Sequence, residues 1–203
     1  MYRRSFALLA ALAAALVLVP AALAARVHVR VEGKTQTIFG TSEPTLNVTA
    51  TALDALDAAS LAGEFYYDVT QTAFGPYVDQ IGRYSAAGES GWDFKVNGTE
   101  PPVGADHVKL KDGDTVLWYW ATFSGTTGPL TLEVETSLVR GKRCFFATGR
   151  NDAGRSSRMR GVVFTLNGRR VSSASGVVCT RLGRYTVRVT KSGAIRSRTY
   201  SGR

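Results

Sequence analysis

Histidine and cysteine are scarce in this chain of 203 residues, with two of each. His28 and His107 lie far from each other and from Cys144 and Cys179. The sequence has no zinc-ligand spacing, no Gly-x-Ser-x-Gly motif and no phosphate-binding glycine loop. A catalytic thiol would need a histidine base, and none is near either cysteine. We therefore expect a protein that is not an enzyme, with no metal site and no certain cofactor.

Long apolar runs are also lacking, except for one at the start. Arg3 and Arg4 precede an uncharged run from Phe6 to Val19, and Ala22-Leu23-Ala24 then forms a small-residue cleavage site. The run is shorter than the about 20 residues that a membrane-spanning helix needs. The pattern predicts a signal peptide over residues 1–25, and hence a secreted or extracellular protein with no membrane span after cleavage.

Charge divides the chain into two parts. Residues 26–127 contain 7 Lys and Arg against 13 Asp and Glu, whereas residues 128–203 contain 16 against 3. Small and turn-forming residues lie between the two parts. We therefore predict one domain over 26–123, a linker over 124–129 and a second domain over 130–203. A basic domain on an exported protein favours anionic wall polymer, lipid headgroups or its own acidic neighbour as partner, and not nucleic acid.

The two cysteines lie in the basic part, and in an oxidising compartment such a pair predicts a disulfide between Cys144 and Cys179. In the chain-entropy description, closing this loop stabilises the fold by about 4 kcal/mol. Short strands recur around them with glycine-containing turns, which is typical of an all-β sandwich. We expect the disulfide to join the two sheets of that sandwich.

The acidic part mixes strand and helix signals. Residues 27–33 alternate apolar and polar side chains, and residues 35–40 suit a hairpin partner. Thr51 and Asp54 form an N-cap signal for a helix over about 52–59. Further strands are expected over 64–70 and 91–98, and the Asp112-Gly113 turn predicts a hairpin between 107–110 and 115–120.

The sequence GWDFKVNG, followed by PPVGADHVKLKDGDTVLWYW, resembles the transcobalamin-like C-terminal domain family over roughly Val27 to Phe123. The resemblance implies an α+β domain of β-grasp-like character in the N-terminal half. It also implies a small-molecule ligand, with cobalamin as one possible cofactor. In animal carriers such a domain closes over the corrinoid together with a large helical barrel, and no segment of this chain corresponds to that barrel.

All three tryptophans lie in this block, at 92, 118 and 120. Trp118 belongs to a strand that is apolar on both faces, so we assign it to the core. For Trp92, a core role and a ligand platform both stay open. The candidate ligand-binding residues are Trp92, Asp93, Asn97, Trp120 and Tyr77.

The basic half loosely resembles Ig-like or carboxypeptidase-regulatory-like β-sandwiches. Its candidate anion-binding residues are Arg150, Arg155, Arg158 and Arg160, since guanidinium groups pair with carboxylate or phosphate. A merely solvated basic face is the alternative.

Three functions compete. The first is a secreted small-molecule or glycan binding protein. The second is a cell-surface interaction protein that binds anionic wall polymer through its arginines. The third and weakest is a glycan-active enzyme, suggested by Asp93, Asp106, Asp112 and Asp114.

Overall fold

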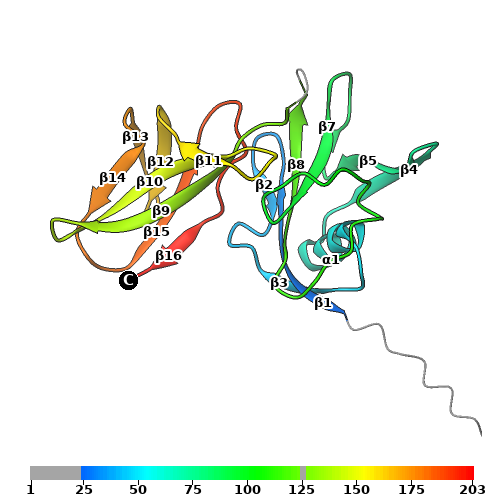
Figure 1. Ribbon diagram of the computed structural model, residues 1–203, viewed down its shortest axis with the longest axis horizontal. Helices are drawn as coiled ribbons and strands as arrows, with labels where there is room; N and C mark the ends of the chain where they lie inside the picture. Colours follow the sequence, from blue (N-terminus) through cyan, green and yellow to red (C-terminus); the bar gives the residue numbers. More distant parts are fainter. Residues whose placement is uncertain (1–23, 124–126) are drawn as a thin grey trace, which may run out of the picture.

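The computed structural model describes residues 24–123 and 127–203, which form two lobes side by side (Figure 1). We call residues 24–123 the N-terminal lobe and residues 127–203 the C-terminal lobe. The signal peptide expected over residues 1–25 lies almost wholly outside the described residues, as does the first part of the expected linker. The predicted domain boundaries stay predictions.

The N-terminal lobe is built on a five-stranded mixed sheet in the order β2-β1-β8-β7, with β3 also paired to β1. β1 runs parallel to β8 and antiparallel to β2 and β3, and β7 is antiparallel to β8. Its strands are β1 (Ala25–Glu32), β2 (Thr37–Phe39), β3 (Thr45–Val48), β7 (Ser90–Val96) and β8 (Thr115–Thr122).

The alternation of β1 gives this sheet two unlike faces. Val27, Val29 and Val31 are fully buried on one face, against the helix. Arg30 and Glu32 project from the other face and are also buried. Since side chains alternate across a strand, the same polypeptide supplies an apolar face and a charged face.

Helix α1 (Ala52–Gly63) covers the apolar face, on the side away from the C-terminal lobe (Figure 1). The predicted N-cap is confirmed: the Thr51 side chain accepts from the Asp54 amide, and the Asp54 carboxylate accepts from the Thr51 amide. The helix runs past the expected end and stops at Glu64, which adopts a left-handed conformation with φ 50°.

A small antiparallel sheet lies beyond the helix, formed by β4 (Tyr67–Thr72), β5 (Gly75–Ile81) and β6 (Tyr84–Ser85). Val78 and Ile81 anchor β5 in the core of the lobe. The tip of the β4–β5 hairpin carries Phe74, which is 98% exposed.

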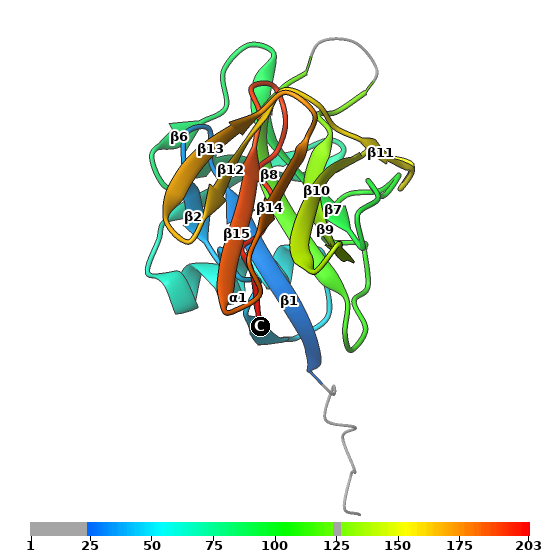
Figure 2. The same cartoon turned by 90° about the vertical axis from the view of Figure 1, so that its left-hand side faces the viewer.

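The C-terminal lobe consists of two four-stranded sheets that pack face to face (Figure 2). The first contains β9 (Thr131–Val139), β10 (Lys142–Arg150), β11 (Ser156–Arg158) and β14 (Val177–Thr180). The second contains β12 (Val162–Leu166), β13 (Arg169–Ser173), β15 (Tyr185–Thr190) and β16 (Tyr200–Gly202). Their shared core holds Leu132, Phe145, Ala147, Phe164, Val187 and Val189.

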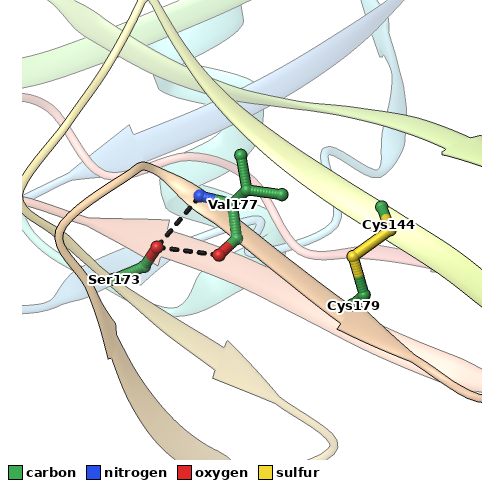
Figure 3. The surroundings of a disulfide bond; sticks show 4 residues. All are labelled: Cys144, Ser173, Val177 and Cys179. Atoms are coloured by element: carbon green, nitrogen blue, oxygen red, sulfur yellow. Dashed lines mark hydrogen bonds between the residues drawn. A yellow bond between two sulfur atoms is a disulfide. The ribbon is translucent and has the colours of Figure 1, made fainter. Parts of the chain in front are cut away.

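The predicted disulfide between Cys144 and Cys179 is confirmed (Figure 3). Its expected position is wrong, however, because it does not join the two sheets. The cysteines lie directly opposite each other on the neighbouring strands β10 and β14 of one sheet, with their Cα atoms 4.0 Å apart. Near its turn, β14 is also held by Ser173, whose hydroxyl accepts from the Val177 amide at 2.9 Å.

The expected α+β domain of β-grasp-like type in the N-terminal half is wrong. The described residues contain sixteen strands, spread over several sheets, and a single helix of 12 residues. The protein is therefore nearly all β. The physical reason is that helical periodicity is confined to residues 52–63, whereas glycine turns and alternating side chains occupy most of the remaining chain.

The charged face of the N-terminal sheet packs against the C-terminal lobe. Glu32 is 2% exposed and pairs with three arginines: Arg30 at 3.0 Å, Arg188 at 2.7 Å and Arg196 at 2.8 Å. Burial lowers the pKa of Arg188, and Glu32 opposes that effect. Beside these pairs, Leu117, Tyr119 and Ala121 of β8 contact Ile195 of the C-terminal lobe. The acidic and basic parts thus neutralise one another where they meet.

Candidate functional site

A groove of about 370 Å³ lies along β7, between the small sheet and the loop before Ala105. Half of its lining residues are aromatic and one is an aspartate. The lining residues are Pro76, Tyr77, Val78, Trp92, Asp93, Phe94, Gly104, Ala105, Trp118 and Phe123. The volume is at the small end of the range for pockets that hold small organic molecules, about 300–1,000 Å³.

The register between β7 and β8 creates the aromatic wall. It places Trp92 opposite Trp120 and Phe94 opposite Trp118. The rings of Phe94 and Trp118 stack at 5.1 Å, and those of Trp92 and Trp120 meet edge to face at 5.7 Å. Such cross-strand aromatic pairs stabilise a sheet and fix the orientation of the rings.

Both groove tryptophans are also core residues. Trp92 is 4% exposed and donates its indole N–H to the Tyr84 carbonyl at 2.8 Å. Trp118 is 2% exposed and donates to the Ala52 carbonyl at 3.1 Å. Because their polar atoms are already bonded, these rings offer a ligand apolar contact only.

Tyr77 and Asp93 provide the accessible and polar parts of the groove. Tyr77 is 41% exposed, and its pKa is raised by burial and by the charges of Asp79 and Asp93. Asp93 accepts from the Phe94 amide at 2.7 Å and from the Tyr119 hydroxyl at 3.2 Å. Burial raises the pKa of Asp93, and these hydrogen bonds oppose the rise. A carboxylate oxygen can accept two hydrogen bonds, and each oxygen of Asp93 accepts one, so each can accept one more from a ligand.

The five predicted ligand residues therefore divide. Tyr77, Trp92 and Asp93 come together in the groove, but Trp120 and Asn97 lie elsewhere. Trp120 borders a cavity of about 270 Å³ between the lobes. Asn97 adopts φ 53° in the turn after β7, donates to Asp114 at 2.8 Å and accepts from the Thr115 amide at 3.0 Å. Its role there is to hold the turn.

Sequence reasoning missed Phe123 and Pro76, which complete the groove. Phe123 follows β8 directly, and its amide donates to the Glu89 carbonyl at 2.8 Å. The sequence signal for Phe123 is its aromatic side chain directly after the predicted strand over 115–120. Because Phe123 is the last residue before the expected linker, it was not taken as a candidate. Pro76 lies near the start of β5, which forms one wall of the groove.

The four candidate anion-binding arginines do not form one cluster. Arg150 makes a two-pronged pair with Glu133, at 2.9 and 3.1 Å, and this hydrogen bonding raises the Arg150 pKa. Arg158 pairs with Glu135 at 3.3 Å and covers the Phe146 ring. Arg155 and Arg160 are exposed and make no ion pair with any residue that the structure describes.

Another cavity, of about 520 Å³, lies between the two lobes and is lined by residues of both. It is lined by paired charges, among them Arg30, Glu43, Glu133 and Arg150. Within residues 24–123 and 127–203, no three or more His, Cys, Asp or Glu side chains are grouped so that they could hold a metal ion. In the same ranges, no helix is long and apolar enough to cross a membrane.

One family model of unassigned role matches the part of the chain that contains most of the groove residues. A family model described as a domain of unknown function, DUF4430, matches residues 49–122, from the start of α1 to the end of β8. No curated protein matches the chain. The resemblance to the transcobalamin-like family is not confirmed by these comparisons.

Among solved structures, the chain is similar to a protein of Ruminococcus gnavus ATCC 29149 that is described as a putative metal binding protein. The two share 15% sequence identity with a TM-score of 0.39. The similarity covers 49% of this chain and 99% of that one.

Proposed function

We propose that this is an exported, non-enzymatic binding protein that holds a small molecule in the groove along β7. The observation that carries the proposal is the combination of an aromatic cavity of about 370 Å³ with one exposed ring, Tyr77, and one carboxylate, Asp93. Ligand pockets typically combine an apolar lining with a few polar groups that orient the ligand. The fixed rings need no rearrangement to receive a flat molecule.

The ligand that suits this groove has an apolar or ring-shaped face and a hydrogen-bond donor directed to Asp93. A sugar ring or a small heterocycle satisfies both conditions. A whole cobalamin is larger than the drug-sized molecules that such volumes hold, so only part of it would enter. We retain cobalamin as a probe because of the sequence resemblance.

Export is supported by the disulfide, which is typical of oxidising compartments. Strand β1 begins at Ala25, so cleavage after Ala24 would leave the whole strand in the mature protein. We expect N-terminal sequencing of exported material to start at Ala25 or Arg26. Recovery of exported protein that still begins at Met1 or Tyr2 would overturn this part of the proposal.

The binding proposal is tested by tryptophan fluorescence, since Trp92 and Trp118 line the groove and the Trp120 ring packs against that of Trp92. Chito-oligosaccharide and cyanocobalamin are titrated as probes, and native mass spectrometry searches for a co-purifying molecule. We expect saturable binding that Tyr77→Ala abolishes. Tyr66→Ala is the matched control, because Tyr66 is 61% exposed and does not line the groove. Binding that survives Tyr77→Ala, or no binding of any molecule, would refute the groove as the site.

A second candidate function, attachment to anionic wall polymer, is supported by the exposed guanidinium groups of Arg155 and Arg160. Attachment through exposed arginines should weaken steeply as ionic strength rises. Pull-down with purified cell wall at low and high salt, with Arg155→Ala/Arg160→Ala for comparison, tests it. Retention that is independent of salt and of both arginines would exclude this function.

A further inference from the structure

Lys95 of β7 meets Asp152, in the turn after β10, across the boundary between the lobes. Its Nζ atom lies 2.7 Å from Asp152 Oδ1. Lys95 is 0% exposed, which is rare for lysine. Nζ also donates to the Pro129 carbonyl at 3.0 Å and to the Thr131 hydroxyl at 3.2 Å. The amine is therefore held in one place by groups of the C-terminal lobe.

The carboxylate of Asp152 is held asymmetrically. Its Oδ2 atom accepts from the Gly128 amide at 2.7 Å. Its Oδ1 atom is buried and has no aligned hydrogen-bond donor among the residues that the structure describes, although Lys95 Nζ is in contact with it. One oxygen is thus stabilised by a backbone N–H, while the other faces an amine that is not oriented as in an ordinary hydrogen bond.

A second acid lies beside this pair. Asp93 precedes Lys95 by two residues and so projects from the same face of β7. It accepts from the Tyr119 hydroxyl. A Cβ atom on Gly128 would lie 3.1 Å from that hydroxyl and 3.2 Å from Asp152 Oδ1, so the hydroxyl and the carboxylate flank the same glycine. Burial raises the pKa of Asp93, which suits a group that takes up and returns a proton.

We propose that Lys95 and Asp152 condense to form an amide that joins the two lobes covalently. A bond forms between Nζ and Cγ, and the bond between Cγ and Oδ1 breaks. Two of the three ammonium protons leave with that oxygen as water, and Asp93 relays them and ends unchanged. Oδ2 becomes the amide oxygen and keeps its hydrogen bond from Gly128. No oxidation state changes and no co-reactant is needed.

Two physical effects favour the reaction. Holding the amine against the acid replaces a bimolecular encounter with a local one, which raises the effective concentration of the reacting groups greatly. The product is also uncharged, so the desolvation cost of keeping a buried lysine and a largely covered aspartate charged at the lobe boundary disappears. A permanent ion pair is the competing account of the same contact.

Mass spectrometry of the full-length protein, reduced to open the disulfide, decides between them. We expect an intact mass lower than the sequence mass by one water molecule, and one branched peptide that contains both Lys95 and Asp152. A full sequence mass, with the two peptides recovered separately, would overturn the proposal. Loss of water within a single peptide would overturn it as well, because it indicates an aspartyl imide.

The intact mass alone decides whether the amide forms, and variants then show which residue does what in its formation. Lys95→Arg keeps the charge and Asp152→Ala removes the acid, and both should show their full sequence masses. Asp106→Ala, a carboxylate on another loop, should keep the cross-link. Asp152→Asn should cross-link with loss of ammonia in place of water. Asp93→Asn should lower the cross-linked fraction after timed refolding, and an unchanged time course would remove Asp93 from the mechanism.

Discussion

The two lobes treat their charged residues in opposite ways. Residues 128–203 carry nineteen Lys, Arg, Asp and Glu side chains, and each of them stays at least partly exposed in the described structure. The N-terminal lobe buries Arg30, Glu32 and Lys95, all on the sheet face that meets its neighbour. Buried charges are costly unless they are paired, and most of the partners belong to the other lobe.

This difference indicates that the N-terminal lobe depends on the C-terminal lobe for its stability more than the C-terminal lobe depends on it. The C-terminal lobe has a complete sandwich core of its own, between two sheets. The N-terminal lobe has one apolar face covered by its own helix and one charged face completed by the C-terminal lobe. The groove lies at the edge of this doubly covered sheet, which keeps its rings in place.

The largest single-residue effect is expected on the apolar face. Trp118→Ala removes a ring that stacks on Phe94 and bonds to Ala52, and should lower the free energy of unfolding by about 3–5 kcal/mol. Denaturant titration measures the change. Phe74→Ala is the control, because that ring is 98% exposed and its loss should change stability by about 0.5 kcal/mol or less. Equal effects of the two substitutions would contradict the assignment of Trp118 to the core.

On the charged face, Glu32→Gln leaves three arginines without their shared carboxylate. Breaking a buried pair in this way should lower the free energy of unfolding by about 3 kcal/mol. Glu135→Gln, which removes an exposed pair with Arg158, should cost about 1 kcal/mol or less. If the two variants unfold at the same denaturant concentration, the interface charges do not hold the lobes together.

Within the C-terminal lobe, replacement of Cys144 and Cys179 by serine should lower the free energy of unfolding by about 2–4 kcal/mol. The effect arises inside one sheet, so the groove in the other lobe should keep its probe affinity. Thermal unfolding and probe titration of the same variant measure both quantities. A loss of probe binding in the folded variant would show that the lobes are coupled differently from this account.

The smallest effect concerns pH. The folded-state pKa of Asp93 is raised above the ordinary value of 3.8, chiefly by burial. Its contribution to stability is therefore present at acidic pH and is lost as the pH rises through the folded value. Asp93→Asn should gain stability relative to the unmodified chain between acidic and neutral pH. Parallel pH curves for the two proteins would show that this carboxyl does not titrate as described.

Local signals in the sequence predicted several elements well. The Thr51 and Asp54 cap, the alternation of β1 with its β2 partner and the double-faced burial of β8 all follow from short-range patterns. The disulfide between the two cysteines was predicted from the expected oxidising compartment and from the absence of a histidine base near either thiol. Apart from the cysteine pair, each of these features depends on residues close together in the chain.

Long-range pairing could not be predicted. The hairpin expected between residues 107–110 and 115–120 is wrong, because β8 pairs with β1 and β7 while Asp112 accepts from the Arg26 amide. The Asp112-Gly113 turn is present, with Gly113 at φ 83°, but it leads into β8 beside the start of the parallel strand β1 and does not close a hairpin. Likewise, nothing local shows that Lys95 and Asp152 would meet.

The central claim is that the N-terminal lobe needs the C-terminal lobe, but not the reverse. The most direct test compares the unfolding of residues 24–123, residues 127–203 and the full chain under the same conditions. We predict a cooperative transition for the isolated C-terminal lobe, and little or no cooperative folding for the isolated N-terminal lobe, whose Glu32 would lose Arg188 and Arg196 and whose Lys95 would lose Asp152. Two isolated lobes that each unfold as cooperatively, and at the same denaturant concentration, as in the full chain would contradict the claim.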